Sequence, residues 1–223
     1  MMRLRVAAAT LAALLGTAQA SAESLVARGN EPFWRLEIGA DSLTFEPMGE
    51  PAVTAPIETR SVADGHPRIV AGGIEVTVIE RLCADTMTGM AFPVGVEISY
   101  GGKRFLGCGG DTMTAIEGGW RIVRIEGDPP PDDATITVEF SRDGKVSGKS
   151  GCNSFFGDYT LSGEGLAFGP LGGTFMACAP PVMETEQRVL GLLKKVTRVT
   201  PGENAQLRLM AGDEPALVLE RVD

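Results

Sequence analysis

The chain contains a single histidine among its 223 residues, and this scarcity argues against several common enzyme sites. A Ser-His-Asp or Cys-His site needs a histidine beside its nucleophile, and no serine or free cysteine has an evident place next to His66. A zinc site of histidine and cysteine lacks a ligand set for the same reason. His66 lies among turn residues in ADGHPRIV and precedes a proline, so we expect it in an exposed loop.

Beyond the N-terminus the sequence has no apolar run that approaches the roughly 18 residues needed to cross a membrane. The N-terminus has the parts of a secretory signal peptide: basic MMRLR, apolar VAAATLAALLG and small residues in TAQASA. We predict a signal peptide over residues 1–22, with cleavage after Ala20 or Ala22. No cysteine lies at the cleavage point, so no lipid anchor is expected, and an uncleaved N-terminal anchor is the alternative. The predicted location is periplasmic or secreted.

Basic residues are also scarce, with 20 Lys and Arg against 29 Asp and Glu. Removal of Arg3 and Arg5 with the signal peptide leaves 18 against 29, a net charge of −11. An acidic surface repels phosphate backbones and anionic headgroups. Nucleic acid and anionic membrane surfaces are therefore not expected partners.

The stretch SGKSGCNSFFGDYTLSG, residues 147–163, begins like a phosphate-binding loop but lacks one of its glycines. The pattern G-x-x-x-x-G-K-[ST] requires glycine at position 143, which is Asp143. The segment also lacks the spacing of a G-x-S-x-G nucleophile elbow. Both observations argue against a nucleotide or serine-hydrolase site. A pair of carboxylates, as in glycosidases, stays open, because Asp and Glu are plentiful and their separations in space are not visible in the sequence.

Only four cysteines are present, and in an exported chain an even number favours disulfides over metal ligands or nucleophiles. Three pairings are possible. We favour Cys83 with Cys108 and Cys152 with Cys178, because each bond then closes a loop of about 26 residues within one half of the chain. In the chain-entropy model such a loop stabilises the fold by about 3.5 kcal/mol.

The sequence does contain many short alternating apolar segments, which are typical of antiparallel sheets. VGVEISY places Val94, Val96 and Ile98 on one face, and a Gly-Gly turn follows it. GIEVTVIERL alternates up to the adjacent apolar pair Val78 and Ile79, which suggests a bulge or twist. Further strands are expected in PFWRLEI, SLTFEPM, KRFLGC, TITVEF, KVSGKS, LAF, QLRLM and ALVLE.

The expected architecture is mostly β, with two small antiparallel β-barrels or curved sheets and one helix in the C-terminal domain. The helix is predicted in PPVMETEQRVLGLLKKV, about fourteen residues long, from the helical spacing of Met183, Leu190 and Leu193. The small, polar stretch GDTMTAIEGG marks the join between the domains. We therefore expect an N-terminal β domain over 23–112, a linker over 113–118 and a C-terminal domain over 119–223.

Five side chains are candidates for a binding or structural polar role. Asn30 and Glu31 lie in a predicted turn of ARGNEPFWRLEI, and Trp34 either joins them in a ligand rim or fills the core. The core position is favoured, because buried aromatics dominate small cores. The side chain of Asn153 either bonds the backbone in a tight bend, which we favour, or presents a polar contact. Glu186 lies on or near the apolar stripe of the helix, either as a buried acid paired with a backbone amide or an arginine, or as a residue at the edge of the stripe.

The second half resembles the META domain, also called the HslJ-like domain, over roughly residues 119–222. The resemblance is carried by Trp120, the GCN box at 151–153, FFGDY at 155–159, TFMAC at 174–178 and the pattern of Met183, Glu186 and Leu190. It implies a small lipocalin-like β-barrel or curved sheet with one helix, in an exported protein that is not known as an enzyme. Members of the family are associated with heat shock, novobiocin tolerance, motility or virulence. Phe175 departs from the family pattern, which has a polar or basic residue there.

The first half is similar to another exported bacterial family over about residues 26–112. This resemblance is centred on GNEPFW and on CADTMTGMAFPVGVEI followed by GCGGD. The family is found next to META or lysozyme-inhibitor-like domains, and the resemblance implies no catalytic role.

Together these features predict a disulfide-stapled envelope protein that acts by binding, as a maintenance, stress or antibiotic-tolerance factor. No catalytic, cofactor-binding or metal-binding residue is expected, and the partner is an envelope protein or a small apolar ligand. One alternative is an inhibitor of a basic cell-wall hydrolase such as lysozyme, which an acidic protein would attract. A second alternative is a weak hydrolase that uses carboxylates.

Overall fold

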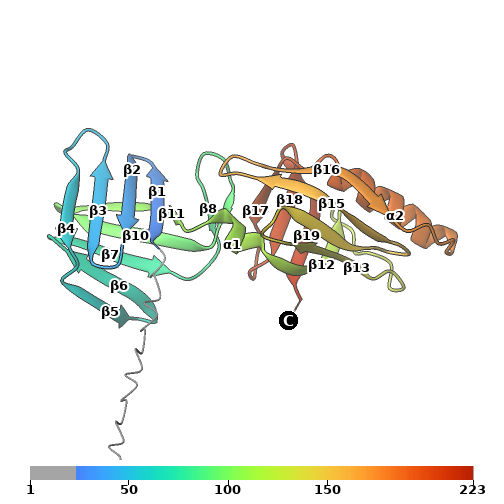
Figure 1. The fold of residues 1–223 in the computed structure, drawn as a ribbon, viewed down its shortest axis with the longest axis horizontal. Coiled ribbons are helices and arrows are strands. Elements are labelled where there is room, and N and C mark those ends of the chain that lie inside the picture. The colour runs from blue at the N-terminus through green and yellow to red at the C-terminus, as the bar shows by residue number, and fades with distance from the viewer. Residues whose placement is uncertain (1–23, 223) are drawn as a thin grey trace, which may run out of the picture.

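The computed structural model describes residues 24–222, which form two curled antiparallel β-sheets side by side along the long axis of the molecule (Figure 1). The mostly β architecture with two curved sheets is therefore confirmed. The predicted signal peptide and its cleavage site lie outside the described residues. Within those residues, no helix has the length and apolar character needed to cross a membrane.

The first sheet has nine strands in the spatial order β4-β3-β2-β1-β11-β10-β7-β6-β5. Their bounds are β1 Leu25–Asn30, β2 Phe33–Ile38, β3 Ser42–Pro47, β4 Val53–Pro56, β5 Thr59–Ala63, β6 His66–Ala71, β7 Ile74–Ile79, β10 Val94–Tyr100 and β11 Lys103–Gly109. The sheet curls around a core that includes Trp34, Phe45, Val76, Ile98 and Phe105. The pairing of β1 with β11 joins the beginning and the end of this sheet.

Turn chemistry sets the hairpins of the first sheet. Gly101 and Gly102 have φ angles of 55° and 74°, and the hairpin predicted there joins β10 to β11. His66 is not in an exposed loop as expected. It is the first residue of β6, pairs with Ala63 across the hairpin and is half-buried. The reason is that the tight turn occupies only the two residues before His66, both with positive φ, so the strand begins directly after them.

The bulge suggested at Val78 and Ile79 is absent, because β7 runs in unbroken register with β10 through both residues. Val78 is buried in the core, and Ile79, next in the strand, points to the opposite face of the sheet. The adjacent apolar pair therefore indicates a strand with apolar surroundings on both faces rather than an irregular strand.

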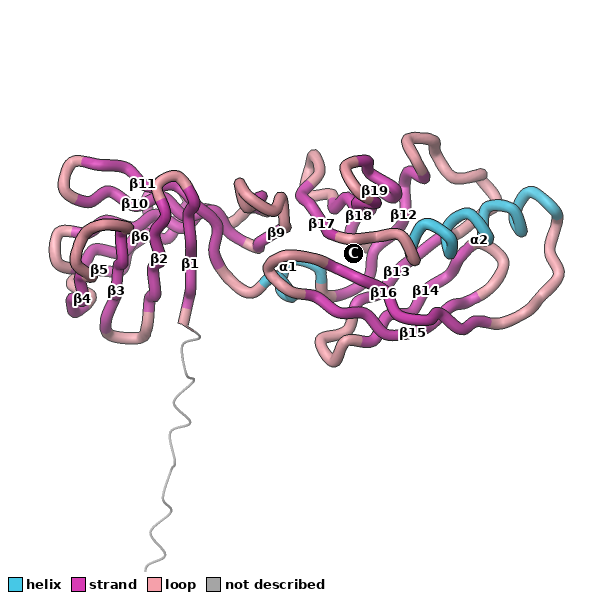
Figure 2. Tube along the Cα trace, turned by 90° about the horizontal axis from the view of Figure 1, so that it is seen from above, coloured by secondary structure: helices cyan, strands magenta, loops and turns pink. Residues whose placement is uncertain are grey.

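Residues 80–93, between β7 and β10, leave the first sheet and form a strap with a short hairpin, β8 (Cys83–Ala84) and β9 (Ala91–Phe92). The strap reaches toward the second sheet in both views (Figures 1 and 2). Met90 and Ala91 are fully buried there, in the core formed by the second sheet. The first half of the chain thus contributes side chains to the core of the second half.

The second sheet has eight strands in the order β16-β15-β14-β13-β12-β19-β18-β17. Their bounds are β12 Gly118–Ile125, β13 Ile136–Phe140, β14 Lys145–Ser150, β15 Ser154–Leu161, β16 Leu166–Gly173, β17 Arg198–Pro201, β18 Leu207–Ala211 and β19 Glu214–Arg221. The sheet curls until its edges meet, where Leu166 N donates to Thr197 O at 2.9 Å. Trp120, Phe140 and Phe155 are among the large side chains that fill its interior.

The segment predicted as a linker, residues 113–118, is not an independent connector. Most of it forms α1 (Thr112–Ile116), capped by the side chain of Asp111, and β12 begins at its end. Ala115 and Ile116 are buried in the core of the second sheet. The two apolar residues hold the helix in place, although the small polar residues around them dominate the composition of the stretch.

The predicted C-terminal helix is α2 (Pro180–Leu193), 14 residues long, and it packs against β14. Its buried side chains are Val182, Glu186, Val189, Leu192 and Leu193. Met183 and Leu190, which were expected on the buried stripe, are only partly buried. Glu186 and Leu193, which the sequence placed on or near the stripe, are buried, and the buried face extends to Val182 and Val189.

Candidate functional site

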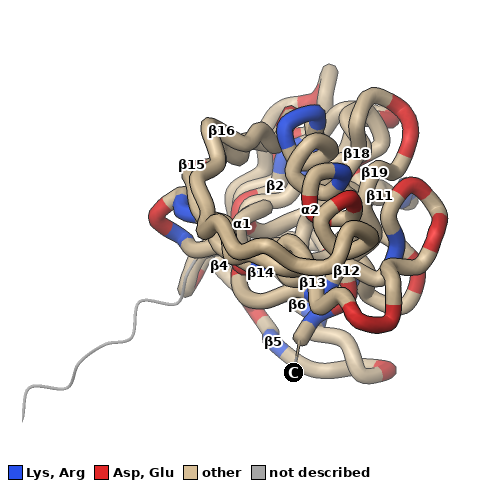
Figure 3. Tube along the Cα trace, turned by 90° about the vertical axis from the view of Figure 1, so that its right-hand side faces the viewer, with Lys and Arg blue, Asp and Glu red and all other residues tan. Residues whose placement is uncertain are grey.

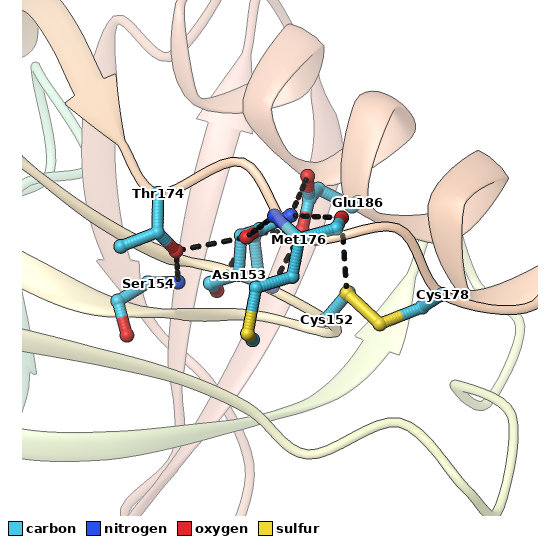
Figure 4. The surroundings of a disulfide bond; sticks show 8 residues. Cys152, Asn153, Ser154, Thr174, Met176, Cys178 and Glu186 are labelled. Atoms are coloured by element: carbon cyan, nitrogen blue, oxygen red, sulfur yellow. Dashed lines mark hydrogen bonds between the residues drawn. A yellow bond between two sulfur atoms is a disulfide. The ribbon is translucent and has the colours of Figure 1, made fainter.

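Glu186 of α2 is only 8% exposed and lies in a compact polar network next to the Cys152–Cys178 disulfide (Figure 4). Its Oε2 accepts hydrogen bonds from the backbone N–H of Asn153 at 2.8 Å and from Ser150 Oγ at 3.0 Å. Its Oε1 accepts from Asn153 Nδ2 at 3.0 Å. The partner of the buried acid is therefore the bend at Asn153, one of the two possibilities that the sequence left open.

The carboxamide of Asn153 extends the network to the segment before α2. Its Oδ1 accepts from Met176 N at 2.7 Å and from Thr174 Oγ1 at 2.8 Å, and its Nδ2 also donates to Met176 O at 3.2 Å. Asn153 and Glu186, predicted separately, are thus brought together. The disulfide pairing within the second half is as predicted, and the bond reinforces the same junction.

This network holds the β14–β15 bend, residues 174–178 and α2 together, and both Glu186 oxygens are occupied by hydrogen bonds from the protein itself. A buried polar network that is fully paired rigidifies a fold. A general acid or base needs an oxygen that can reach a substrate. The arrangement is therefore a structural clamp. The clamp also holds residues 174–176 in place, and within that segment the side chain of Phe175 is 100% exposed.

Trp34 fills the first core, as the favoured interpretation of GNEPFW predicts. Its indole lies over the backbone of two strands, because a Cβ on Gly29 would overlap its ring nitrogen and a Cβ on Gly107 would lie 2.6 Å from its Cζ2. Glu31 lies exposed in the β1–β2 turn. The turn predicted at Asn30, Glu31 and Pro32 is present.

Asn30 has a role that the sequence did not reveal, because it fastens the strap to the first sheet. Its Nδ2 donates to Asp85 Oδ2 and Thr86 Oγ1, each at 3.0 Å. Asp85 Oδ1 also accepts from the backbone N–H groups of Met87 and Thr88. Partial burial raises the pKa of the Asp85 carboxyl, but the hydrogen bonds from Thr88, Asn30 and Met87 together outweigh it and hold the pKa below its ordinary value.

The second attachment of the strap is the Cys83–Cys108 disulfide, with Cα atoms 5.6 Å apart. This pairing also agrees with the prediction. The bond joins β8 to β11, on the face of the first sheet opposite its core. Two attachments, one covalent and one by hydrogen bonds, therefore fix the strap over that face.

The strap, the outer face of the first sheet and the β17–β18 turn together border a cavity of about 640 Å³. Its lining mixes basic, acidic and apolar groups, among them Arg28, Ile79, Arg81, Leu82, Gly95 and Leu106. Leu106 is 58% exposed. Gly95 lies between Cys108 and Ile79 in the strand ladder, so no side chain fills the surface at that position.

Sequence reasoning missed this cavity, although two signals were present. Ile79 follows Val78 in a strand that otherwise alternates, and Gly95 takes a position of VGVEISY that would ordinarily hold a polar side chain. Both place unusual residues on the face that would ordinarily be polar and solvated. Neither signal reveals that the strap between these two strands folds back over that face and turns it into a cavity.

Charged groups elsewhere are spread over the surface. Viewed from the α2 end, acidic residues lie mainly on loops and turns at the periphery (Figure 3). Within residues 24–222, no group of three or more His, Cys, Asp or Glu side chains is arranged to hold a metal ion.

Comparison with known proteins gives one family and two structures. A family model described as META domain matches residues 112–223. A solved structure, "NMR structure of the protein from Burkholderia xenovorans", is 30% identical and covers 49% of this chain and 86% of that chain, with a TM-score of 0.42. A second, "NMR structure of the protein", is 27% identical and covers 47% and 89% of the two chains, with a TM-score of 0.39. The search of curated proteins found no match.

Proposed function

Because this chain belongs to the META domain family through residues 112–223, we propose that it is an exported binding protein of the bacterial envelope that performs no chemistry of its own. The observation that carries the proposal is the cavity of about 640 Å³ beneath the strap. Small-molecule sites are commonly clefts of about 300–1,000 Å³ with mixed apolar and polar linings.

The attachment of the strap supports a binding role. The Cys83–Cys108 disulfide and the bonds from Asn30 to Asp85 and Thr86 fix one wall of the cavity before any ligand arrives. A preformed wall lowers the entropy that is lost on binding. Two disulfides also support export, because such bonds persist in oxidising compartments.

The state of the acidic groups supports binding over hydrolysis. Both oxygens of Glu186 accept hydrogen bonds from the clamp. In the cavity, Glu97 pairs with Arg104 at 2.8 Å, and Asp85 accepts the hydrogen bonds that shape the strap. Each of these three carboxylates therefore already has a partner within the protein, and Glu80 is the remaining carboxylate of the cavity lining.

The GNEPFW motif links the first half of the chain to the proposed binding site. Three residues of the motif contribute to the cavity or to the sheet beneath it: Gly29, Asn30 and Trp34. Gly29 leaves space for the Trp34 ring, and Asn30 attaches the strap to the sheet. We assign residues 26–112 to the exported family that this motif resembles. A role in envelope stress or antibiotic tolerance follows from the associations of the META family.

The test is a ligand-observed NMR screen of small molecules against residues 23–223, compared with Gly95→Leu. A Cβ at Gly95 would lie 3.6 Å from the Cβ of Ile79, an ordinary contact, so the fold accepts a side chain that projects into the cavity. Ligands should bind the wild-type protein and fail to bind Gly95→Leu. Gly163→Leu is the matched control, because a Cβ at Gly163 has no neighbour within 4 Å. Ligands that bind Gly95→Leu as well as the wild type would contradict the proposal.

A second candidate, inhibition of a basic cell-wall hydrolase, is favoured by the fully exposed Phe175 on its fixed loop in an acidic protein. Small inhibitors insert such a loop into the cleft of the enzyme. Micromolar protein should then inhibit purified lysozyme, and Phe175→Ser should remove the inhibition. Phe33→Ser, a change on the first sheet, should leave it intact. Absence of inhibition by the wild-type protein eliminates this candidate.

A further inference from the structure

Two arginines that line the cavity differ from the other described arginines, because their guanidinium groups have no acceptor within residues 24–222. Thirteen arginines lie within residues 24–222. The guanidinium groups of eleven of them donate a hydrogen bond or form an ion pair within that part of the chain. The other two, Arg28 and Arg81, have no such partner there, and both line the cavity. The arginines left without a protein acceptor are therefore those that face the candidate site.

The backbones of Arg28 and Arg81 both lie near the Cys83–Cys108 disulfide in the strand register or in the sequence. Arg28 of β1 is the register partner of Cys108 in β11. Arg81 precedes Cys83 by two residues in the strap, and Cys83 is bonded to Cys108. Two different elements, β1 and the strap, therefore contribute an arginine to the lining of the cavity that also contains this disulfide. Planar guanidinium groups match carboxylate and phosphate oxygens, which they bind through paired hydrogen bonds.

The acidic residues of the lining do not fully neutralise the positive charge of Arg28 and Arg81. Glu97 is paired with Arg104, and Asp85 accepts hydrogen bonds from Asn30 and the strap backbone. Glu80 is the remaining carboxylate of the lining, and it is exposed. The cavity thus offers two guanidinium groups that have no acceptor among residues 24–222, on a protein whose overall charge is strongly negative.

The rest of the lining is suited to an apolar group. Ile79, Leu82 and Leu106 line the cavity, and Gly95 leaves space between Ile79 and the disulfide. Leu106 lies on an outer sheet face yet contacts no core, so an apolar ligand would remove its exposed surface from water.

Resting on the proposed function, we propose that the ligand is a small amphiphilic anion. Its carboxylate or phosphate group binds Arg28 and Arg81, and its apolar portion lies against Ile79 and Leu106. Carboxylate and phosphate ligands of this kind share a single anionic head group on a short apolar body. The titration below identifies which head group the protein prefers.

Calorimetric titration of residues 23–223 with octanoate, octyl phosphate and 1-octanol tests this inference. Charged hydrogen bonds contribute enough for each anion to bind about tenfold or more tightly than the alcohol at low salt, and added salt should reduce that advantage. The stronger of the two anions identifies the preferred head group. Arg28→Gln and Arg81→Gln should each weaken anion binding about tenfold and leave octanol binding unchanged. Arg68→Gln, which removes an ion-paired arginine of the same sheet, should change neither.

The possible failures are distinguishable. If octanol binds as tightly as the anions and Gly95→Leu removes all three, the proposed binding function stands and the anion inference is overturned. If Arg68→Gln weakens the anions as much as Arg28→Gln, general surface charge explains the effect and the inference is overturned. If none of the three probes binds, the inference is overturned, while the NMR screen tests the proposed function separately. Should Gly95→Leu not fold, Leu106→Ser replaces it and should weaken all octyl compounds without changing the response to inorganic phosphate.

Discussion

Single residues of the GNEPFW motif and of the GCN box determine how a neighbouring side chain packs or forms hydrogen bonds. Gly29 faces Trp34 across the β1–β2 hairpin, and the absence of a side chain at Gly29 lets the indole lie against the strand backbone. Asn153 uses both its donor and its acceptor atoms, and Glu186 uses both oxygens. Such residues are fixed by shape or by hydrogen-bond complementarity, so near-isosteric changes should be costly.

Glu186→Gln should therefore destabilise the protein although the side chain keeps its size. Each Glu186 oxygen faces an N–H group that can only donate: Asn153 N at Oε2 and Asn153 Nδ2 at Oε1. A glutamine must turn its own NH₂ donor toward at least one of them, which leaves buried donors unpaired and costs about 1–3 kcal/mol. Urea unfolding at neutral pH measures the loss.

The matched control is Glu184→Gln, two residues earlier on the same helix, where the side chain is exposed. Substitutions at exposed positions change the free energy of unfolding by about 0.5 kcal/mol or less. Equal losses for the two variants would contradict the role of Glu186 as the centre of the clamp.

At the scale of elements, the strap shows how a segment with little regular structure is held in place. Only two short strands, β8 and β9, give it a sheet of its own. Its order depends on the Asp85 hydrogen bonds, the Cys83–Cys108 disulfide and the burial of Met90. Because the strap forms one wall of the cavity, these three attachments also set the shape of the candidate site.

The Asp85 attachment should depend on pH. The pKa of its carboxyl is lower in the folded protein than its ordinary value of 3.8, so the ionised form stabilises the fold. This contribution is complete above the ordinary value and is lost as the pH falls through the depressed pKa. The stability advantage of the wild type over Asp85→Asn should therefore be constant near neutral pH and shrink below pH 3.8.

Urea unfolding of both proteins between neutral pH and the lowest pH at which they fold measures this difference. The comparison cancels the titration of the other carboxyl groups, since both proteins share them. An advantage that stays the same at every pH would show that the Asp85 charge does not hold the strap.

For the whole molecule, the two sheets are coupled through the core of the second. Met90 and Ala91 of the strap are buried with side chains of the second sheet, and so are Ala115 and Ile116 of α1. The strap also approaches β17 through Gly89, where a Cβ would lie 3.5 Å from Thr200 Cγ2. The second core is therefore incomplete without residues that precede the META match.

Met90→Ala should consequently destabilise the second half although Met90 belongs to the first. Met90 is 0% exposed, and shortening a buried methionine costs about 2–5 kcal/mol. Unfolding followed by the fluorescence of Trp120, in a Trp34→Phe background, reports on the second core alone.

Met87→Ala, in the same strap but 68% exposed, is the control and should have little effect. If Met90→Ala leaves the Trp120 transition unchanged, the two halves fold independently and the strap is only an appendage.

The sequence by itself determined the features that arise from local chemistry. Alternating apolar residues specify the strands, the Gly101-Gly102 pair permits its hairpin turn, and α2 has the predicted length. The observed pairing of the cysteines is the one that the sequence favoured among three, since it closes short loops within each half. These properties depend on a few consecutive residues or on chain entropy, so no knowledge of the packing is needed.

Only the tertiary structure decided which groups Glu186 meets, where the strap packs and that a cavity exists. Asn30 meets Asp85 across 55 positions of sequence, and Asn153 meets Glu186 across 33. Such contacts depend on the curl of each sheet and on the space left beside it, which residues close in sequence do not encode. Arg28 and Arg81 are ordinary surface residues in the sequence, and they become a candidate anion site only because the fold places them around one cavity.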